Sequence, residues 1–142
     1  MTQRVLIVDD EQANIDLLKA FLEDVADDVR GITDSSQAEK VFNEFEPDLL
    51  LLDLHMPPPD GLTLLRRLSK ARDNAGYLPV IILTADNNRA ALKAALELEV
   101  DDYLIKPLDR DLVRLRARNM LQTRHLFKEV TRTTGAYPKV QR

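Results

Sequence analysis

The chain has 142 residues and a net charge of −4, and its 44% hydrophobic and 31% charged residues are typical of a globular protein with one core. It contains no cysteine, which excludes disulfides, thiol nucleophiles and thiolate metal sites. Its longest strongly apolar run, residues 49–52, is too short to span a bilayer, and the N-terminus does not resemble a signal peptide, so we expect a cytoplasmic protein without membrane contact.

Short apolar runs alternate with helical patterns along the chain. The runs predict strands at residues 5–8, 29–32, 49–52, 80–83 and 103–105. Apolar residues at spacings of three and four predict helices over residues 15–25, 36–45, from 61 to before Gly76, 89–98, and from Asp109 onward. Strand followed by helix five times predicts an α/β fold, a doubly wound parallel sheet of five strands. No glycine-rich loop indicates a dinucleotide fold or a P-loop.

Polar residues follow four of the five predicted strands. They are Asp9 and Asp10 after the first strand, Asp53 after the third, Thr84 after the fourth, and Lys106 after the fifth. Because the carboxyl ends of parallel strands line one edge of a sheet, we expect these side chains to meet there. Any one of them alone is more simply a turn residue, a helix cap or a solvated charge. All of them together, in this order, are not explained that way.

This set of side chains has a definite chemistry. Three clustered carboxylates repel one another unless a cation or protons lie among them. Since oxygen ligands dominate, the sequence predicts a hard cation, and Mg²⁺ suits such a site. The hydroxyl of Thr84 can donate to a phosphoryl oxygen, and the ammonium of Lys106 can neutralise charge there. The set therefore predicts phosphoryl transfer to an aspartate.

Four segments resemble the receiver domains of response regulators in two-component signal transduction, and the resemblance as a whole covers about residues 3–125. They are Val8-Asp9-Asp10-Glu11, Asp53 to Gly61 (Asp-Leu-His-Met-Pro-Pro-Pro-Asp-Gly), Leu83-Thr84-Ala85 and Tyr103-Leu104-Ile105-Lys106-Pro107. The resemblance implies a flavodoxin-like (βα)5 sheet with strand order 2-1-3-4-5. It also implies a switch controlled by phosphorylation, because these domains take a phosphoryl group from a histidine kinase or a histidine phosphotransfer protein.

The resemblance assigns a role to each position. Asp53 matches the phospho-acceptor, and Thr84 and Lys106 match the pair that holds the phosphoryl group. For the Mg²⁺ cofactor, the matching direct ligands are Asp10, Asp53 and the backbone carbonyl of His55, while Asp9 acts through water. Tyr103 matches the aromatic residue that turns inward with the threonine, and Lys106-Pro107 matches a peptide bond that is usually cis.

Other positions allow two interpretations or match the family pattern less closely. His55 and Asp86 match variable positions that tune dephosphorylation in relatives, although His55 alone is equally well an exposed loop residue. The kinase-docking surface of the family corresponds here to Ala13, Asn14, Leu17 and Leu18, with Pro107 and Leu108. Residues 57–59, three consecutive prolines, are expected to stiffen the loop beside Asp53.

The last helix is predicted to be unusually long and basic. Residues 109–142 hold 9 basic and 3 acidic side chains, a net of +6, whereas residues 1–108 have a net of −10. Its arginines, at positions 110, 114, 116, 118 and 124, most simply line a solvated face. The alternative is a signalling helix or a homodimer contact through the fourth and fifth helices. We expect a receiver domain over residues 1–125 and a helix extension with linker over 126–142, with residues 131–142 frayed.

The arginine-rich segment also resembles the sequence that joins receivers to cyclic-dinucleotide phosphodiesterase or cyclase domains. An output domain covalently linked in a longer protein is therefore expected, with a stand-alone receiver as the alternative. No DNA-binding motif follows and the domain is acidic, so no direct contact with nucleic acid is expected.

Two other functions are alternatives for this set of residues. A haloacid-dehalogenase-like aspartyl phosphatase uses similar residue types, but its nucleophile comes near the N-terminus and its acidic pair late in the chain, the reverse of the order here. A receiver-like interaction module that is independent of phosphorylation would lack one of the four central residues, which are Asp10, Asp53, Thr84 and Lys106. The chain is therefore expected not to be an enzyme beyond its own phosphorylation and dephosphorylation.

Overall fold

A five-stranded parallel sheet forms the centre of the computed structural model, which describes residues 2–85 and 89–134. The strands are β1 (Arg4–Val8), β2 (Asp28–Ile32), β3 (Leu49–Asp53), β4 (Val80–Ala85) and β5 (Asp102–Lys106). Their order is β2-β1-β3-β4-β5, and every pairing is parallel. The predicted strands and the flavodoxin-like order are confirmed.

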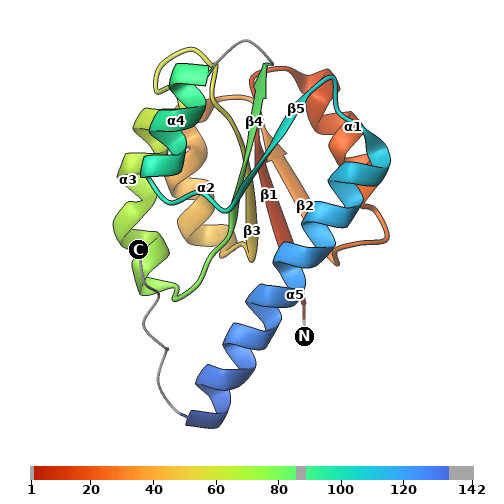
Figure 1. The fold of residues 1–142 in the computed structure, drawn as a ribbon, viewed down its shortest axis with the longest axis vertical. Helices are drawn as coiled ribbons and strands as arrows, with labels where there is room; N and C mark the ends of the chain where they lie inside the picture. Colours follow the sequence, from red (N-terminus) through yellow and green to blue (C-terminus); the bar gives the residue numbers. More distant parts are fainter. Residues whose placement is uncertain (1, 86–88, 135–142) are drawn as a thin grey trace.

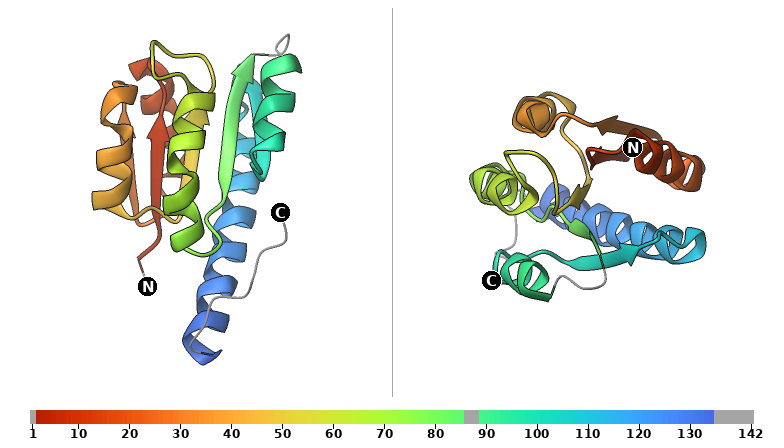
Figure 2. Two further views of the ribbon diagram at one scale, coloured as in Figure 1. Left: turned by 90° about the vertical axis from the view of Figure 1, so that its left-hand side faces the viewer. Right: turned by 90° about the horizontal axis from the view of Figure 1, so that it is seen from above.

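Helices cover both faces of the sheet, as Figures 1 and 2 show. They are α1 (Gln12–Leu22), the 3-10 turn η1 (Ser35–Gln37) that leads into α2 (Ala38–Phe45), α3 (Gly61–Asn74), α4 (Arg89–Glu97) and α5 (Arg110–Thr134). Helices α1 and α5 lie on one face, and α2, α3 and α4 lie on the other. The first helix begins and ends three residues earlier than predicted. It ends at Leu22, where the N–H groups of Val25 and Ala26 both donate to the carbonyl of Leu22 and close a turn.

The alternation of side chains along each strand separates the core into two parts. In β1, Leu6 and Val8 pack towards α2, α3 and α4, whereas Val5 and Ile7 pack towards α1 and α5. The whole of β3 is buried, as expected for a central parallel strand covered by helices on both faces. The acidic residues therefore follow two strands, β1 and β3, that are buried at their carboxyl ends.

Helix α5 continues to Thr134, so the prediction of fraying is wrong for residues 131–134, while residues 135–142 lie outside the described residues. Asp109 caps its N-terminus by accepting hydrogen bonds from the N–H groups of Asp111 and Leu112. The helix runs back along the sheet and projects past the end where the chain begins (Figure 1). Within the described residues, neither α5 nor any other helix is long and apolar enough to cross a membrane.

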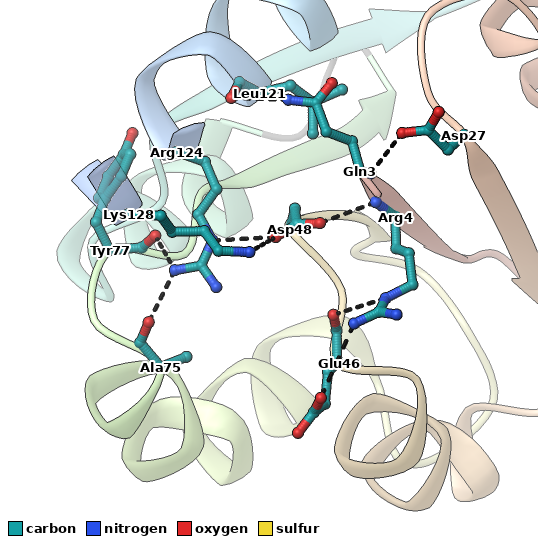
Figure 3. A network of polar contacts seen from close by, with 10 residues as sticks. All are labelled: Gln3, Arg4, Asp27, Glu46, Asp48, Ala75, Tyr77, Leu121, Arg124 and Lys128. Carbon is teal, nitrogen blue, oxygen red and sulfur yellow. Dashed lines mark hydrogen bonds and ion pairs between the residues drawn. The ribbon is translucent and has the colours of Figure 1, made fainter. Parts of the chain in front are cut away.

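A buried polar network fixes α5 to the amino-terminal end of the sheet (Figure 3). Arg124 of α5 donates to the carbonyls of Ala75 and Tyr77 at 2.8 Å each, and its Nε lies 3.4 Å from Asp48. Asp48 also accepts from Lys128 Nζ at 3.1 Å and from the N–H of Arg4 at 2.9 Å. We call these six residues and their contacts the Asp48 network.

The prediction that all the arginines of α5 line a solvated face is wrong for Arg124, which is only 7% exposed. Its guanidinium is buried because it has three partners, one of them an aspartate that is itself 3% exposed. A buried charge is tolerated when it is paired and hydrogen-bonded in this way. Arg114, nearer the start of the helix, pairs with Asp24 and donates to the carbonyl of Phe21.

Candidate functional site

The residues that the sequence predicted for the site come together at the carboxyl edge of the sheet. Asp9 and Asp10 follow β1, and Asp53 is the last residue of β3. Strand pairing aligns Asp53 with Leu83, so that Thr84 is one residue further along the neighbouring strand. Lys106 ends β5, where it is paired with Ala85. The edge lies at the upper end of the strands in Figure 1.

Three carboxylates form a compact cluster at this edge. One oxygen from each of Asp9, Asp10 and Asp53 lies within 4.8 Å of the others. Asp9 and Asp53 are buried, with exposures of 0% and 3%, whereas Asp10 is exposed. An all-oxygen donor set that is open on one side fits a hard divalent cation such as Mg²⁺, which binds one or two carboxylates and keeps other ligand positions for water or phosphate oxygens.

Lys106 connects two of these carboxylates. Its Nζ lies 3.2 Å from Asp9 Oδ2 and 3.2 Å from Asp53 Oδ2. Burial alone would lower the pKa of Lys106, but the charges of Asp53 and Asp9 outweigh it and the pKa is raised above its usual value. The ammonium therefore stays protonated and offsets part of the negative charge of the cluster.

The carboxyl group of Asp53 is electrostatically unusual. Burial is the largest influence on its pKa and raises it, while the N–H of His55, which donates to Asp53 Oδ1 at 3.2 Å, lowers it. The charge of Asp9 also raises the pKa and Lys106 lowers it, and the net effect is a rise from 3.8 to about 6. Perturbed carboxyl groups in an open site are candidates for function. Near neutral pH Asp53 is mostly ionised, and a carboxylate is the form that acts as a nucleophile.

Thr84 and Tyr103 are on neighbouring strands but in different environments. Thr84 is 2% exposed, and its hydroxyl donates to the carbonyl of Ala85 at 3.3 Å. The side chain of Tyr103 is 38% exposed and lies beside the exposed Ile105. The inward orientation of the tyrosine expected in the switched state is therefore not the one present here.

Other predicted positions have different outcomes. The Lys106-Pro107 peptide bond is cis, as the resemblance implied, and the Pro58-Pro59 bond is also cis. Leu18 is 0% exposed, so its assignment to the docking surface is wrong: it faces the core from α1, whereas Leu17 is 40% exposed. Asp86 lies outside the described residues.

The loop between β3 and α3 depends on residues that the sequence did not single out. The buried hydroxyl of Ser35 donates to the carbonyl of Pro57 at 3.1 Å. Gly61 lies so close to the end of β3 that a Cβ there would be 2.4 Å from the carbonyl oxygen of Asp53 and 2.7 Å from Leu54 Cα. The glycine after Asp60 was the available signal for this close approach, whereas no local pattern marked Ser35.

The fold and the edge define a doubly wound α/β domain with an acidic cluster and a lysine at the carboxyl ends of its strands. Residues 5–118 match the response regulator receiver domain family. The chain belongs to this family of two-component signalling proteins.

Solved structures agree with the assignment. The receiver domain of NtrX from Brucella abortus is 30% identical, with a TM-score of 0.76 over 84% of this chain and 98% of that one. The receiver domain of the Francisella response regulator 1452 is also 30% identical, with a TM-score of 0.74 over 85% and 98%. A longer NtrX chain from Brucella abortus, solved in complex with ATP, is 30% identical with a TM-score of 0.80, and the match covers 92% of this chain but 29% of that one.

Proposed function

We propose that Asp53 accepts a phosphoryl group from a histidine kinase or a histidine phosphotransfer protein, in a reaction that depends on Mg²⁺. The observation that carries the proposal is the position of Lys106, whose ammonium lies 3.2 Å from both Asp9 and Asp53 at the edge where the carboxylates cluster. A carboxylate nucleophile, a metal-binding cluster and a fixed cation are the components that phosphoryl transfer to aspartate needs.

Mg²⁺ would be held by the carboxylates of Asp10 and Asp53 and by the backbone carbonyl of His55, with Asp9 acting through water. When bound, the ion neutralises charge on the phosphoryl oxygens and aligns them. The cluster supports this assignment because its oxygens are within 4.8 Å of one another and Asp10 leaves it open to solvent.

The transfer exchanges one bond to phosphorus for another. An oxygen of Asp53 forms the new P–O bond while the P–N bond to the donor histidine breaks, and the imidazole keeps the electron pair and takes up a proton. Lys106 neutralises charge on the transferred group. The hydroxyl of Thr84 leaves the carbonyl of Ala85 and donates to a phosphoryl oxygen, and the space it vacates admits the side chain of Tyr103.

The donor protein would dock next to the site. Ala13, Asn14 and Leu17 of α1, with Pro107 and Leu108 after β5, are the matching surface once the buried Leu18 is removed from it. An open cavity of about 370 Å³ lies beside the cluster and gives a donor side chain room to approach. Its lining residues are Asp10, Leu54, His55, Met56, Pro57, Asp60, Leu62 and Ala91.

Phosphorylation would control an output through the face formed by α4, β5 and α5. This face exposes large apolar side chains, namely Leu96, Tyr103, Ile105, Leu112 and Leu115. We propose a homodimer through this face, because apolar side chains that are exposed together on neighbouring elements mark a site where another molecule binds. We also propose that residues 1–125 are the receiver and 126–142 the extension towards a linked output domain, of the cyclic-dinucleotide phosphodiesterase or cyclase kind.

The test is intact-protein mass spectrometry after incubation with acetyl phosphate, with and without Mg²⁺. Wild type should gain one phosphoryl group only with Mg²⁺, and Asp53→Asn should gain none. The matched control is Asp111→Asn, an exposed aspartate at the start of α5, which should label like wild type. Catalytic release of phosphate from many added substrates would instead indicate the aspartyl phosphatase. No labelling, together with no binding of beryllofluoride, would indicate the phosphorylation-independent module.

A further inference from the structure

The carboxylate of Asp9 is fully occupied by protein donors. Its Oδ1 accepts the N–H of Glu11 at 2.9 Å and the side-chain amide of Asn14 at 3.4 Å. Its Oδ2 accepts the same amide of Asn14 at 3.2 Å and pairs with Lys106 Nζ at 3.2 Å. A carboxylate offers about four acceptor positions, two on each oxygen. A cation can therefore bind Asp9 directly only by displacing one of these donors.

The three donors to Asp9 differ in how readily they could be displaced. The N–H of Glu11 is part of the backbone where α1 begins, and Lys106 also pairs with Asp53. The side-chain amide of Asn14 donates to both oxygens of Asp9. Its amide is neutral, so it occupies acceptor positions and leaves the negative charge of Asp9 in place. The carboxylate thus keeps its attraction for a cation at long range but is blocked as a ligand.

We propose that Asn14 is a positioning residue that keeps Asp9 out of direct contact with the bound divalent ion, so that water remains between them. This inference rests on the metal site proposed above. The physical reason is that Mg²⁺ prefers one or two protein carboxylates and keeps several waters. Asp10 and Asp53 already supply two carboxylates. Ca²⁺ takes six to eight oxygen ligands, so a third direct carboxylate would favour Ca²⁺ over Mg²⁺.

The test uses the 142-residue chain with Mn²⁺ as a spectroscopic probe. Broadening of the Mn²⁺ electron paramagnetic resonance signal in ¹⁷O-water counts the water molecules bound directly to the ion. Asn14→Leu keeps a side chain of similar size and removes its donors, so we expect one fewer bound water than in wild type. We also expect the ratio of the Mg²⁺ to the Ca²⁺ dissociation constant, measured by calorimetry, to rise by about tenfold.

Gln12→Ala is the matched control, because Gln12 is an amide on the same turn of α1 that donates to Asp16 and not to Asp9. It should bind the same number of waters as wild type. Asn14→Ala carries the same expectation as Asn14→Leu and replaces it if the leucine variant is misfolded by circular dichroism. An unchanged water count in a variant that binds Mn²⁺ would overturn the role of Asn14 alone. Failure of wild type to bind Mn²⁺ would overturn the metal site itself, and the role of Asn14 with it.

Discussion

Replacing Arg124 by methionine should destabilise the domain strongly, although Arg124 lies at the end of the sheet opposite the acidic cluster. Methionine keeps most of the aliphatic volume and removes the guanidinium. The carbonyls of Ala75 and Tyr77 then each lose a donor at 2.8 Å, and Asp48 loses one of its two cationic partners. Breaking a buried ion pair costs about 3–5 kcal/mol. Because Lys128 and the N–H of Arg4 still serve Asp48, we expect about 2–4 kcal/mol.

Urea denaturation followed by circular dichroism at 222 nm measures this loss. Arg118→Met is the matched control, since Arg118 is an exposed arginine of the same helix, and such a change should alter the free energy of unfolding by no more than about 0.5 kcal/mol. A double-mutant cycle with Asp48→Asn should show coupling, because the two side chains share one network. Equal and small effects of Arg124→Met and Arg118→Met would refute the energetic importance of the Asp48 network.

Three further predictions concern single residues. Because its pKa is raised to about 6, Asp53 contributes stability below pH 3.8 that is lost as the pH rises through about 6. Asp53→Asn should therefore stabilise the metal-free domain at pH 7.5, by less than the limit of about 3 kcal/mol since the cluster is open to solvent at Asp10. In urea titrations this gain should shrink as the pH falls below about 6 and vanish only below pH 3.8. Gly61→Ala should lower the free energy of unfolding by about 1–3 kcal/mol in urea titrations and slow labelling by acetyl phosphate, because the Cβ of the alanine would meet the backbone of Asp53. Unchanged stability and labelling would contradict this close approach. Burial and then the charge of Asp101 raise the pKa of Tyr77, so its neutral form stabilises the domain below pH 10, and this contribution is lost as the pH rises through the raised pKa. Asp101→Asn should lower the pKa of Tyr77, as measured by absorbance titration at 295 nm. An unchanged pKa would argue against the 3.0 Å hydrogen bond from Tyr77 to Asp101.

The sheet and its carboxyl edge could be predicted because parallel strands leave a strong signal. Buried strands such as β3 are continuous apolar runs, and the polar residue that ends each run marks the edge. Asp9, Asp53 and Lys106 were found in this way, and strand pairing then places Lys106 Nζ 3.2 Å from an oxygen of each aspartate. The prediction needed only local pattern and the rule for parallel sheets.

The Asp48 network could not be predicted by the same reasoning. Asp48 and Arg124 are 76 positions apart, and each resembles an ordinary surface residue in its local sequence. An arginine that follows several others on a helix is predicted to be solvated, and its burial is evident only when its partners are placed in space. The contact between Asn14 and Asp9 was hidden for a related reason, since the sequence placed Asn14 only on the docking surface, which uses the same turn of α1.

The course of α5 has a consequence for how this domain can be joined to others. The helix starts beside the carboxyl edge of the sheet, runs back along the sheet, and projects past the opposite end after the turn that the Asp48 network holds (Figures 1 and 3). From Arg110 to Thr134 it spans about 36 Å. A reporter or effector fused after Thr134 would thus start far from Asp53 and leave the carboxyl edge uncovered. Its orientation would be set by the last anchored turn, near Lys128, so that shortening or lengthening the helix by one residue would rotate the fused domain by about 100°.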